Sequence, residues 1–222
     1  MLKLKPRLQM AADMVRGGAR LADIGTDHAY LPAALILGGR IKSAIAADLR
    51  KGPLENAEAT GRTYEIADRV QLRLSDGLKL VLPEEVDDIV IAGMGGILIA
   101  EILEAAPWVK DKDKRLILQP QSHSEDVRRY LFGNGFEIIE EAACFEDGKV
   151  YICMCAEYTG KSSEHSEAEI LLGKFIGRTD EASRAFIEKK LKRVKIRLDA
   201  LEKTQPDSDE IKQLEAILDE VK

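Results

Sequence analysis

The chain has 222 residues, 45% of them hydrophobic and 32% charged, and this composition excludes wholesale disorder. No apolar run reaches the roughly 18 residues of a membrane-spanning helix, and the basic, amphipathic start lacks the apolar stretch and cleavage site of a secretory signal. Three cysteines without a CxxC pair and only three histidines lead us to expect reduced thiols, no metal, no membrane contact and a cytoplasmic location.

Apolar, β-branched segments alternate with segments of helical period over the first two thirds of the chain. Such strands are buried on both faces, which is typical of an α/β fold with a parallel sheet covered by helices on both sides. Strands are predicted at residues 20–24, 43–48, 70–75, 88–92 and 115–119, and helices at 30–37, 53–63, 97–106 and 124–132.

Two further strand-like runs lie within residues 135–158 and are separated by Asp147-Gly148. An Asp-Gly pair between two such runs is a strong hairpin signal, so the last two strands should be antiparallel. A parallel sheet closed by an antiparallel hairpin is the ending of a Rossmann-like methyltransferase rather than of a dinucleotide-dependent dehydrogenase.

The composition changes after a linker-like stretch at residues 159–163, and no strand pattern follows. Two heptad seams separated by a short polar loop predict an antiparallel, coiled-coil-like helical hairpin. We therefore predict a methyltransferase domain at residues 1–160 and a helical domain at 161–222. The seams consist of Ile187, Leu191, Val194, Leu198 and Leu201, and of Ile211, Leu214, Leu218 and Val221.

Acidic residues follow three successive predicted strands: Asp27 after Gly25, then Asp48, then Asp76-Gly77. Ligands of such sheets bind beyond the carboxyl ends of the strands, where an aspartate such as Asp48 accepts the ribose hydroxyls of an adenosine. The pattern GxGxxG is missing after the first strand, so a pyrophosphate fits poorly there. Asp27 suits the cationic amino acid end of S-adenosylmethionine instead, although Asp27 or Asp48 alone is also compatible with helix capping.

The fourth strand runs into AGMGG at residues 92–96, where many base methyltransferases carry a DPPY-type or NPPY-type motif. The absence of that motif counts against an exocyclic amine as the target and leaves a ring nitrogen open. Tyr30 either stacks on a flipped base or fills the pocket, and His28 either serves the site or bonds its own turn. Gln119, at the end of the fifth strand, either lines the target pocket or belongs to a loop beside Pro120.

The net charge of −6 conceals two basic segments. Residues 1–20 contain five basic side chains and one acid, and residues 189–197 contain six basic side chains in nine positions. Lys189, Arg193 and Arg197 are four apart and share one helix face. This ridge either binds RNA phosphates, which would anchor and orient the RNA, or is a solvated helix face.

The segments DIGTDHAYLP, AADL, SDGL, AGMGG and LQPQ together resemble the bacterial tRNA (adenine-22-N1)-methyltransferase family (TrmK). The resemblance covers residues 1–160, and the helical tail is similar to that family's architecture. It implies that S-adenosylmethionine is the cofactor, that tRNA is the partner, and that ring nitrogen 1 of adenine 22 in the D-loop is methylated. The alternatives are a methyltransferase acting on a small molecule or protein, and a non-catalytic nucleotide-binding or RNA-binding module.

The site candidates form four groups, taken from these motifs and from the resemblance. Those for cofactor binding are Asp23, Gly25, Asp27, Asp48, Leu49, Asp76, Gly77 and Gly93. The catalytic candidates are Asp27, His28 and Tyr30, and those for the target-base pocket are Met94, Gly95, Gly96 and Gln119. The RNA-binding candidates are Lys3, Lys5, Arg7, Lys189, Arg193 and Arg197.

Overall fold

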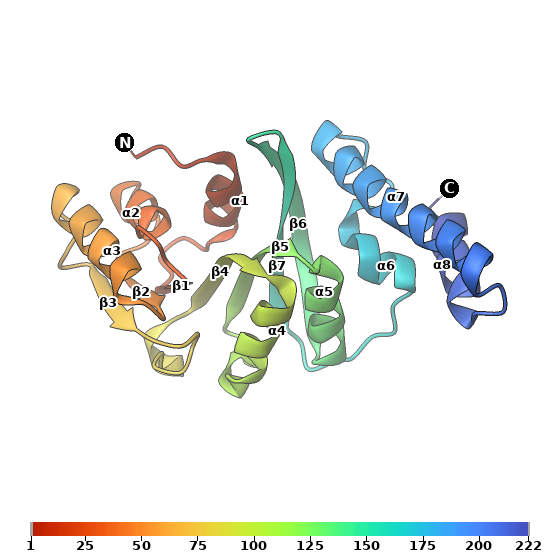
Figure 1. Cartoon of the computed structure of the whole chain (residues 1–222). Helices are drawn as coiled ribbons and strands as arrows, with labels where there is room; N and C mark the ends of the chain where they lie inside the picture. The colour runs from red at the N-terminus through yellow and green to blue at the C-terminus, as the bar shows by residue number, and fades with distance from the viewer. Residues whose placement is uncertain (1, 222) are drawn as a thin grey trace.

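The computed structural model describes residues 2–221, and its centre is a seven-stranded sheet (Figure 1). The strands are β1 (Leu21–Ile24), β2 (Ala44–Asp48), β3 (Val70–Leu74), β4 (Asp88–Gly95), β5 (Arg115–Ser122), β6 (Phe136–Glu146) and β7 (Lys149–Tyr158). They lie in the order β3-β2-β1-β4-β5-β7-β6; the first five are parallel, and β7 is antiparallel to both β5 and β6. The predicted Rossmann-like fold class is confirmed, although β4 and β5 extend further than predicted.

Helices cover both faces of the sheet because successive strand residues point to opposite sides. Ile89 and Ile91 pack in the core on the side of α4 and α5, whereas Val90 packs in the second core with α1, α2 and α3. The helices are α1 (Pro6–Met14), α2 (Tyr30–Leu37), α3 (Lys51–Thr63), α4 (Gly96–Glu104), α5 (Ser124–Gly133), α6 (Glu167–Leu172), α7 (Glu181–Thr204) and α8 (Asp209–Glu220).

The hairpin of β6 and β7 turns at Asp147 and Gly148, as predicted. Both residues have positive φ, 49° and 71°, which is the conformation that a type I′ turn requires and that Asp-Gly tolerates. Glu146 pairs directly with Lys149 across this turn. The two-residue turn therefore sets the antiparallel register in which the sheet closes.

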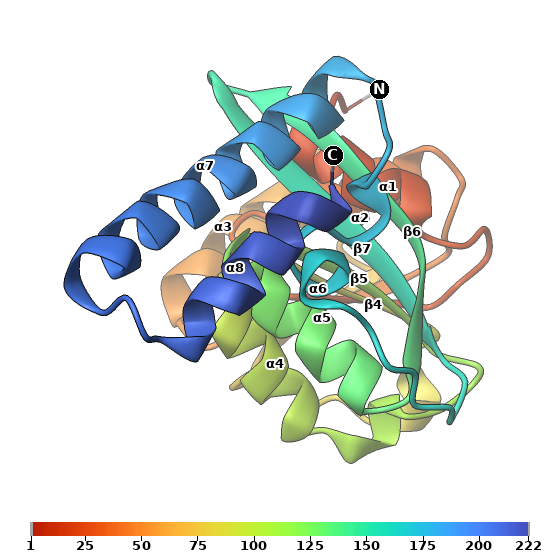
Figure 2. The same cartoon turned by 90° about the vertical axis from the view of Figure 1, so that its right-hand side faces the viewer.

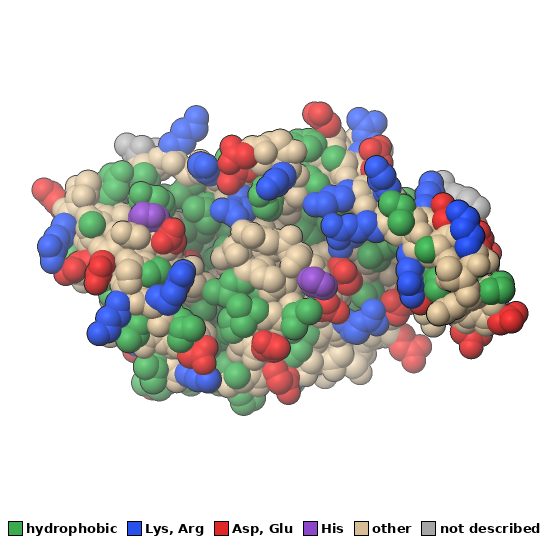
Figure 3. All heavy atoms as spheres, viewed as in Figure 1, with side chains coloured by type: hydrophobic (Ala, Val, Ile, Leu, Met, Phe, Trp, Pro, Cys, Tyr) green, Lys and Arg blue, Asp and Glu red, His purple; other side chains and the backbone are tan. Residues whose placement is uncertain are grey.

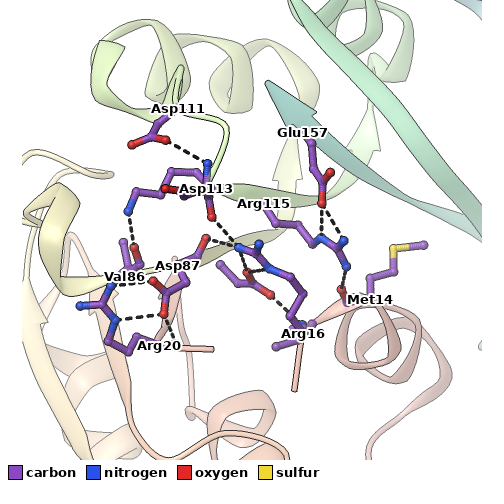
Figure 4. A network of polar contacts seen from close by, with 12 residues as sticks. Met14, Arg16, Arg20, Val86, Asp87, Asp111, Asp113, Arg115 and Glu157 are labelled. Atoms are coloured by element: carbon purple, nitrogen blue, oxygen red, sulfur yellow. Dashed lines mark hydrogen bonds and ion pairs between the residues drawn. The ribbon is translucent and has the colours of Figure 1, made fainter. Parts of the chain in front are cut away.

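A polar network ties the segment before β1 to the starts of β4 and β5 (Figure 4). The Asp88 carboxylate is fully buried and accepts hydrogen bonds from the backbone N–H and the Nε of Arg16, both at 2.7 Å. Arg115 donates to Glu157 of β7 at 2.6 Å. These contacts lie at the amino ends of the parallel strands, so they hold the sheet together at the edge opposite the strand-end aspartates.

The helices α6, α7 and α8 pack at the β6 end of the sheet, far from β3 (Figure 1), and α7 and α8 lie side by side (Figure 2). This arrangement confirms the predicted helical hairpin. Val194 and Leu201 of the predicted seam are buried, and so is Ile217, which the predicted seam did not contain. Within residues 2–221, no helix combines the length and the apolar character needed to cross a membrane.

A buried ion pair joins the helical tail to the sheet. Arg128 of α5 and Glu141 of β6 are both fully buried, with Nη2 and Oε1 2.7 Å apart. Arg128 also donates to the carbonyl of Leu171, and Glu141 accepts the backbone N–H of Lys174 at 2.6 Å. A Cβ on Gly173, whose φ is +60°, would lie 2.0 Å from Glu141 Oε2. We call these contacts the joint.

The joint bears on the predicted division of the chain at residue 160. Leu172, Phe175 and Phe186 follow that boundary, yet they belong to the same buried cluster as the sheet residues. A smaller cluster of Ala168, Val194 and Ile217 belongs to the tail alone. The two-domain division stays a prediction, and the tail's first helices pack on the sheet's own core.

Candidate active site

A cavity of about 670 Å³ lies at the carboxyl ends of β1 and β4. The turn after β1, the first turn of α2, the end of β4 and the N-terminal segment at residues 2–8 form its walls. Gly93 belongs to the end of β4, and the lining also includes Tyr64 and Gln121. Carboxyl ends of parallel strands are where α/β folds bind ligands, so this cavity is the candidate active site.

Asp23 is the buried carboxylate of this cavity, with 8% of its surface exposed. Burial, opposed by a hydrogen bond with Thr26 and reinforced by the charge of Asp48, raises the pKa of Asp23 to about 6. Within residues 2–221, Asp23 has no basic partner that would stabilise its charge. A cationic ligand group entering the cavity would provide that stabilisation.

The turn after β1 brings the backbone close to the cavity. Gly25 has a φ of +76°, and the N–H groups of Gly25 and Thr26 both donate to the carbonyl of Ala47 on β2, at 2.8 and 3.1 Å. A Cβ on Gly25 would lie 2.0 Å from Cε of Met94. The backbone conformation therefore favours glycine here, and a side chain would also have to displace the flexible end of Met94.

The three catalytic candidates lie together at the start of α2. His28 and Tyr30 stack with their ring centres 4.9 Å apart and their planes 6° apart, and Asp27 Oδ2 lies 3.4 Å from His28 Nε2. Asp27 is exposed and does not cap α2, because the N-cap is Ala29, whose N–H donates to Thr26 Oγ1. All three candidates line the cavity, so an exposed carboxylate and a pair of flat rings are available to a ligand.

The other two strand-end aspartates lie outside the cavity lining, along the edge toward β3. One oxygen of Asp48 accepts the N–H of Arg50 at 2.8 Å, and the side chain is 11% exposed. Leu49 beside it is 65% exposed. Asp76 is exposed and pairs with Lys79 at 2.5 Å. Asp27, Asp48 and Asp76 thus share one edge of the sheet, as predicted. Of these three only Asp27 lines the cavity, where Asp23 joins it.

None of the four residues of the predicted target-base pocket lines the cavity, and their role in base binding stays a prediction. Met94 packs on Gly25, as described above, and Gly95 and Gly96 form the junction between β4 and α4. A Cβ on Gly96 would lie 2.0 Å from the carbonyl oxygen of His123, so this glycine is needed for packing. Similarly, a Cβ on Gly77 would contact Ile102 at 3.0 Å.

Gln119 is fully buried, and its Oε1 accepts the N–H of Gly93 at 3.1 Å. It therefore holds the end of β4 in place. The exposed residue that reaches the cavity from β5 is Gln121, two positions later. Gln121 is absent from the predicted site because the predicted strand ends at residue 119, whereas the pairing of β5 with β4 continues to Ser122 through two register shifts.

The basic N-terminal candidates differ in their surroundings. Lys3 is exposed at the cavity and has no ion-pair partner within residues 2–221. Lys5 lies 3.5 Å from Asp147, in a pair that is largely exposed on both sides. Arg7 lies over the ring of Tyr151, and its backbone N–H donates to a carboxylate oxygen at 3.0 Å. Of the three, only Arg7 is held by the fold.

The α7 ridge is divided in the same way. Lys189 and Arg193 are exposed, and they border a small hollow against Gln121 and the residues that follow it. In the part of the chain that the structure describes, neither has an ion-pair partner. Arg197 instead makes two hydrogen bonds of 2.8 Å with Glu210 of α8. Basic side chains gather beside α7 on the face shown in Figure 3.

A sheet of this order, with a glycine turn after β1 and aspartates at three strand ends, defines a Rossmann-like S-adenosylmethionine-dependent methyltransferase. A family model described as "Methyltransferase domain" matches residues 4–154. The chain is 38% identical over 176 residues to the tRNA (adenine(22)-N(1))-methyltransferase of Bacillus subtilis (strain 168), which covers 79% of this chain and 74% of that relative.

Two crystal structures extend this similarity over the tail. The B. subtilis m1A22 tRNA methyltransferase TrmK has a TM-score of 0.85 at 32% identity, covering 100% of this chain and 97% of that one. A putative tRNA (m1A22) methyltransferase of Streptococcus pneumoniae in complex with S-adenosyl-L-methionine has a TM-score of 0.81 at 36% identity, covering 97% and 100%. The chain belongs to the tRNA (adenine(22)-N(1))-methyltransferase family.

Proposed function

We propose that this protein transfers a methyl group from S-adenosylmethionine to ring nitrogen 1 of adenine 22 in the D-loop of tRNA, giving 1-methyladenosine. The observation that carries this proposal is the combination of 38% identity to the B. subtilis enzyme with a strand-end cavity that contains a buried carboxylate. Because its substrate would be tRNA, we place the protein in the cytoplasm.

The described residues fit the cofactor. Asp48 keeps one carboxylate oxygen uncommitted to Arg50, which suits a ribose hydroxyl, and the exposed Leu49 and the Asp76-Gly77 turn suit the adenosine beside it. Asp23 and Asp27 offer negative charge to the ammonium of the methionine part, and Asp23 gains most because its charge is buried and unpaired. When bound, S-adenosylmethionine supplies a methyl group on a positively charged sulfur.

The residues of the cavity have little covalent chemistry to perform. Adenine N1 carries a lone pair, so it can form the new N–CH₃ bond directly as the S–CH₃ bond breaks, and the base takes over the positive charge. The stacked rings of His28 and Tyr30 offer a surface for a base taken out of its stack. We assign stabilisation of the new charge to the exposed carboxylate of Asp27. The walls mainly align the two reactants, which is a proximity effect.

Lys3, Lys189 and Arg193 are the residues we assign to RNA phosphates. All three are exposed, and no carboxylate within residues 2–221 pairs with them. Lys3 lines the cavity, and Lys189 and Arg193 line the small hollow that shares Gln121 with it. Lys5 adds to the local positive potential, whereas Arg7 and Arg197 are engaged within the protein. Phosphate contacts of this kind orient a folded RNA without reading its sequence.

The test is incubation with methyl-labelled S-adenosylmethionine and an unmodified tRNA transcript, followed by mapping of the modified position by primer extension. We expect label in the RNA and a block at position 22 that is absent from a transcript in which guanosine replaces adenosine 22. Label in protein or in small molecules, with none in RNA, would support the alternative methyltransferase. Cofactor binding without any transfer would reject the enzymatic proposal for this substrate.

A further inference from the structure

Gln121 is a polar side chain of the cavity to which the proposed reaction assigns no role. It lies near the end of β5, is exposed, and borders both the cavity and the hollow beside Lys189 and Arg193. Within residues 2–221, its amide has no hydrogen-bond partner. Gln119, of the same type and on the same strand, uses its amide on Gly93, so the fold needs one of these amides and leaves the other free.

The surroundings of the Gln121 amide leave space for a flat group. Gly93 lines the same cavity as Gln121 and has a φ of +83°. A Cβ placed on Gly93 would lie 3.7 Å from Nε2 of Gln121 and would meet no other atom within 4 Å. The amide therefore lies beside an open part of the cavity wall.

A free glutamine amide is chemically matched to adenine. Its carbonyl accepts a hydrogen bond from the N6 amino group while its NH₂ donates to N7, and this bidentate pairing distinguishes adenine from guanine, which presents acceptors at both places. N6 and N7 lie on one edge of adenine and N1 on the other side of N6. A glutamine bound to the N6–N7 edge thus leaves the N1 lone pair free to react.

We propose that Gln121 reads the target adenine through N6 and N7 and thereby presents N1 for methylation. This inference rests on the proposed function and names the base-reading residue of that site. The carbonyl contact also gains strength during the reaction, because the positive charge that forms at N1 spreads to N6 and makes its N–H a better donor. Gln121 would therefore affect the rate of methylation as well as the choice of base.

The test pairs one side-chain deletion with one atom deletion in the RNA. Gln121→Ala is compared with the unchanged protein on tRNA that carries either adenosine or 7-deazaadenosine at position 22, the latter lacking the N7 acceptor. Gln71→Ala, an exposed glutamine on β3 outside the cavity, is the matched control. For each protein, kcat/KM for the tRNA and the Kd for S-adenosylmethionine are measured.

We expect 7-deazaadenosine to lower kcat/KM about tenfold in the unchanged protein and in Gln71→Ala. Gln121→Ala should lower kcat/KM at least tenfold on tRNA with adenosine 22. Replacing that adenosine by 7-deazaadenosine should lower the variant's kcat/KM little further, and its Kd for S-adenosylmethionine should be unchanged. If Gln121→Ala is as sensitive to the missing N7 as the unchanged protein, Gln121 does not read the base. If the unchanged protein does not methylate adenosine 22 at all, the proposed function fails, and the role of Gln121 fails with it.

Discussion

Replacing Asp23 by asparagine tests the electrostatics of the cavity, because it should stabilise the free protein while weakening cofactor binding. Asparagine has almost the same shape as aspartate and can still accept a hydrogen bond from Thr26, but it carries no charge. In the unchanged protein, the pKa of Asp23 is raised to about 6, mainly by burial. Ionised Asp23 is therefore a cost to the folded state that asparagine removes.

The magnitude follows from the difference between the folded and unfolded states. The pKa of Asp23 is about 6 in the folded state and has the ordinary value of 3.8 in the unfolded state. The raised pKa therefore stabilises the folded state fully below pH 3.8, and this stabilisation is lost as the pH rises through 6. The complete loss is about 3 kcal/mol. Asp23→Asn should thus raise the melting temperature by up to about 6–12 °C near pH 8, and the gain should fade toward pH 4.

Differential scanning calorimetry of the free protein across this pH range measures the gain, and titration calorimetry at about pH 8 measures cofactor binding. We expect the Kd for S-adenosylmethionine to rise about tenfold or more, because a hydrogen bond to a charged group is lost. Asp88→Asn is the matched control. Asp88 is also buried but is bonded to Arg16, so its replacement should destabilise the protein by about 1–3 kcal/mol.

Two results would refute this reasoning. If Asp23→Asn lowers the melting temperature near pH 8, or changes it equally at both ends of the pH range, then the ionised carboxylate is not a cost in the free protein. If the variant is stabilised as expected but binds S-adenosylmethionine with unchanged affinity, then Asp23 does not contact the cofactor.

Three further predictions concern the cofactor edge, the ridge and the joint. Asp48→Ala should weaken S-adenosylmethionine binding about tenfold or more in calorimetry; unchanged affinity would exclude Asp48 from the site. Replacing Lys189 and Arg193 together by glutamine should raise the KM for tRNA and flatten the salt dependence of binding. Arg197→Gln, the matched control, should change neither the KM for tRNA nor the salt dependence of binding. If it has the same effect as the double replacement, then Arg197 is as available to RNA as Lys189 and Arg193. Gly173→Ala should lower the free energy of unfolding by about 1–3 kcal/mol, measured as a lower denaturant midpoint, because the new Cβ would clash with Glu141 in the joint. An unchanged midpoint would show that the contacts of the joint rearrange without cost.

The fold was predictable because its main signals are local. Strands buried on both faces read as short apolar runs, and Asp147-Gly148 marks a turn whose two positive φ angles few other pairs tolerate. The strand-end aspartates were predictable for the same reason, since a parallel sheet brings its carboxyl ends to one edge. The raised pKa of Asp23 was not predictable, because it depends on burial and on the charge of Asp48, which is distant in sequence.

The position of Gln121 at the cavity was not predictable, because it depends on the pairing between β4 and β5. Two register shifts near Met94 carry β5 to Ser122 and bury Gln119 beneath Gly93. Nothing within the segment LQPQ says which glutamine turns inward. The sequence also could not show which ridge residues are paired, because Glu210, which neutralises Arg197, lies on another helix.

The end of β5 connects the base pocket to the RNA face. Gln121 borders the cavity, and α5 begins three residues later with Glu125 in its first turn. Glu125 holds the buried Lys190 of α7 at 2.5 Å, and Lys190 directly follows Lys189, one of the two unpaired ridge residues. A single stretch of chain therefore fixes both the amide assigned to the base and the helix assigned to the phosphates. Removal of residues 161–222 should consequently disturb more than RNA affinity, because it also strips Phe175 and Phe186 from the core that supports this stretch.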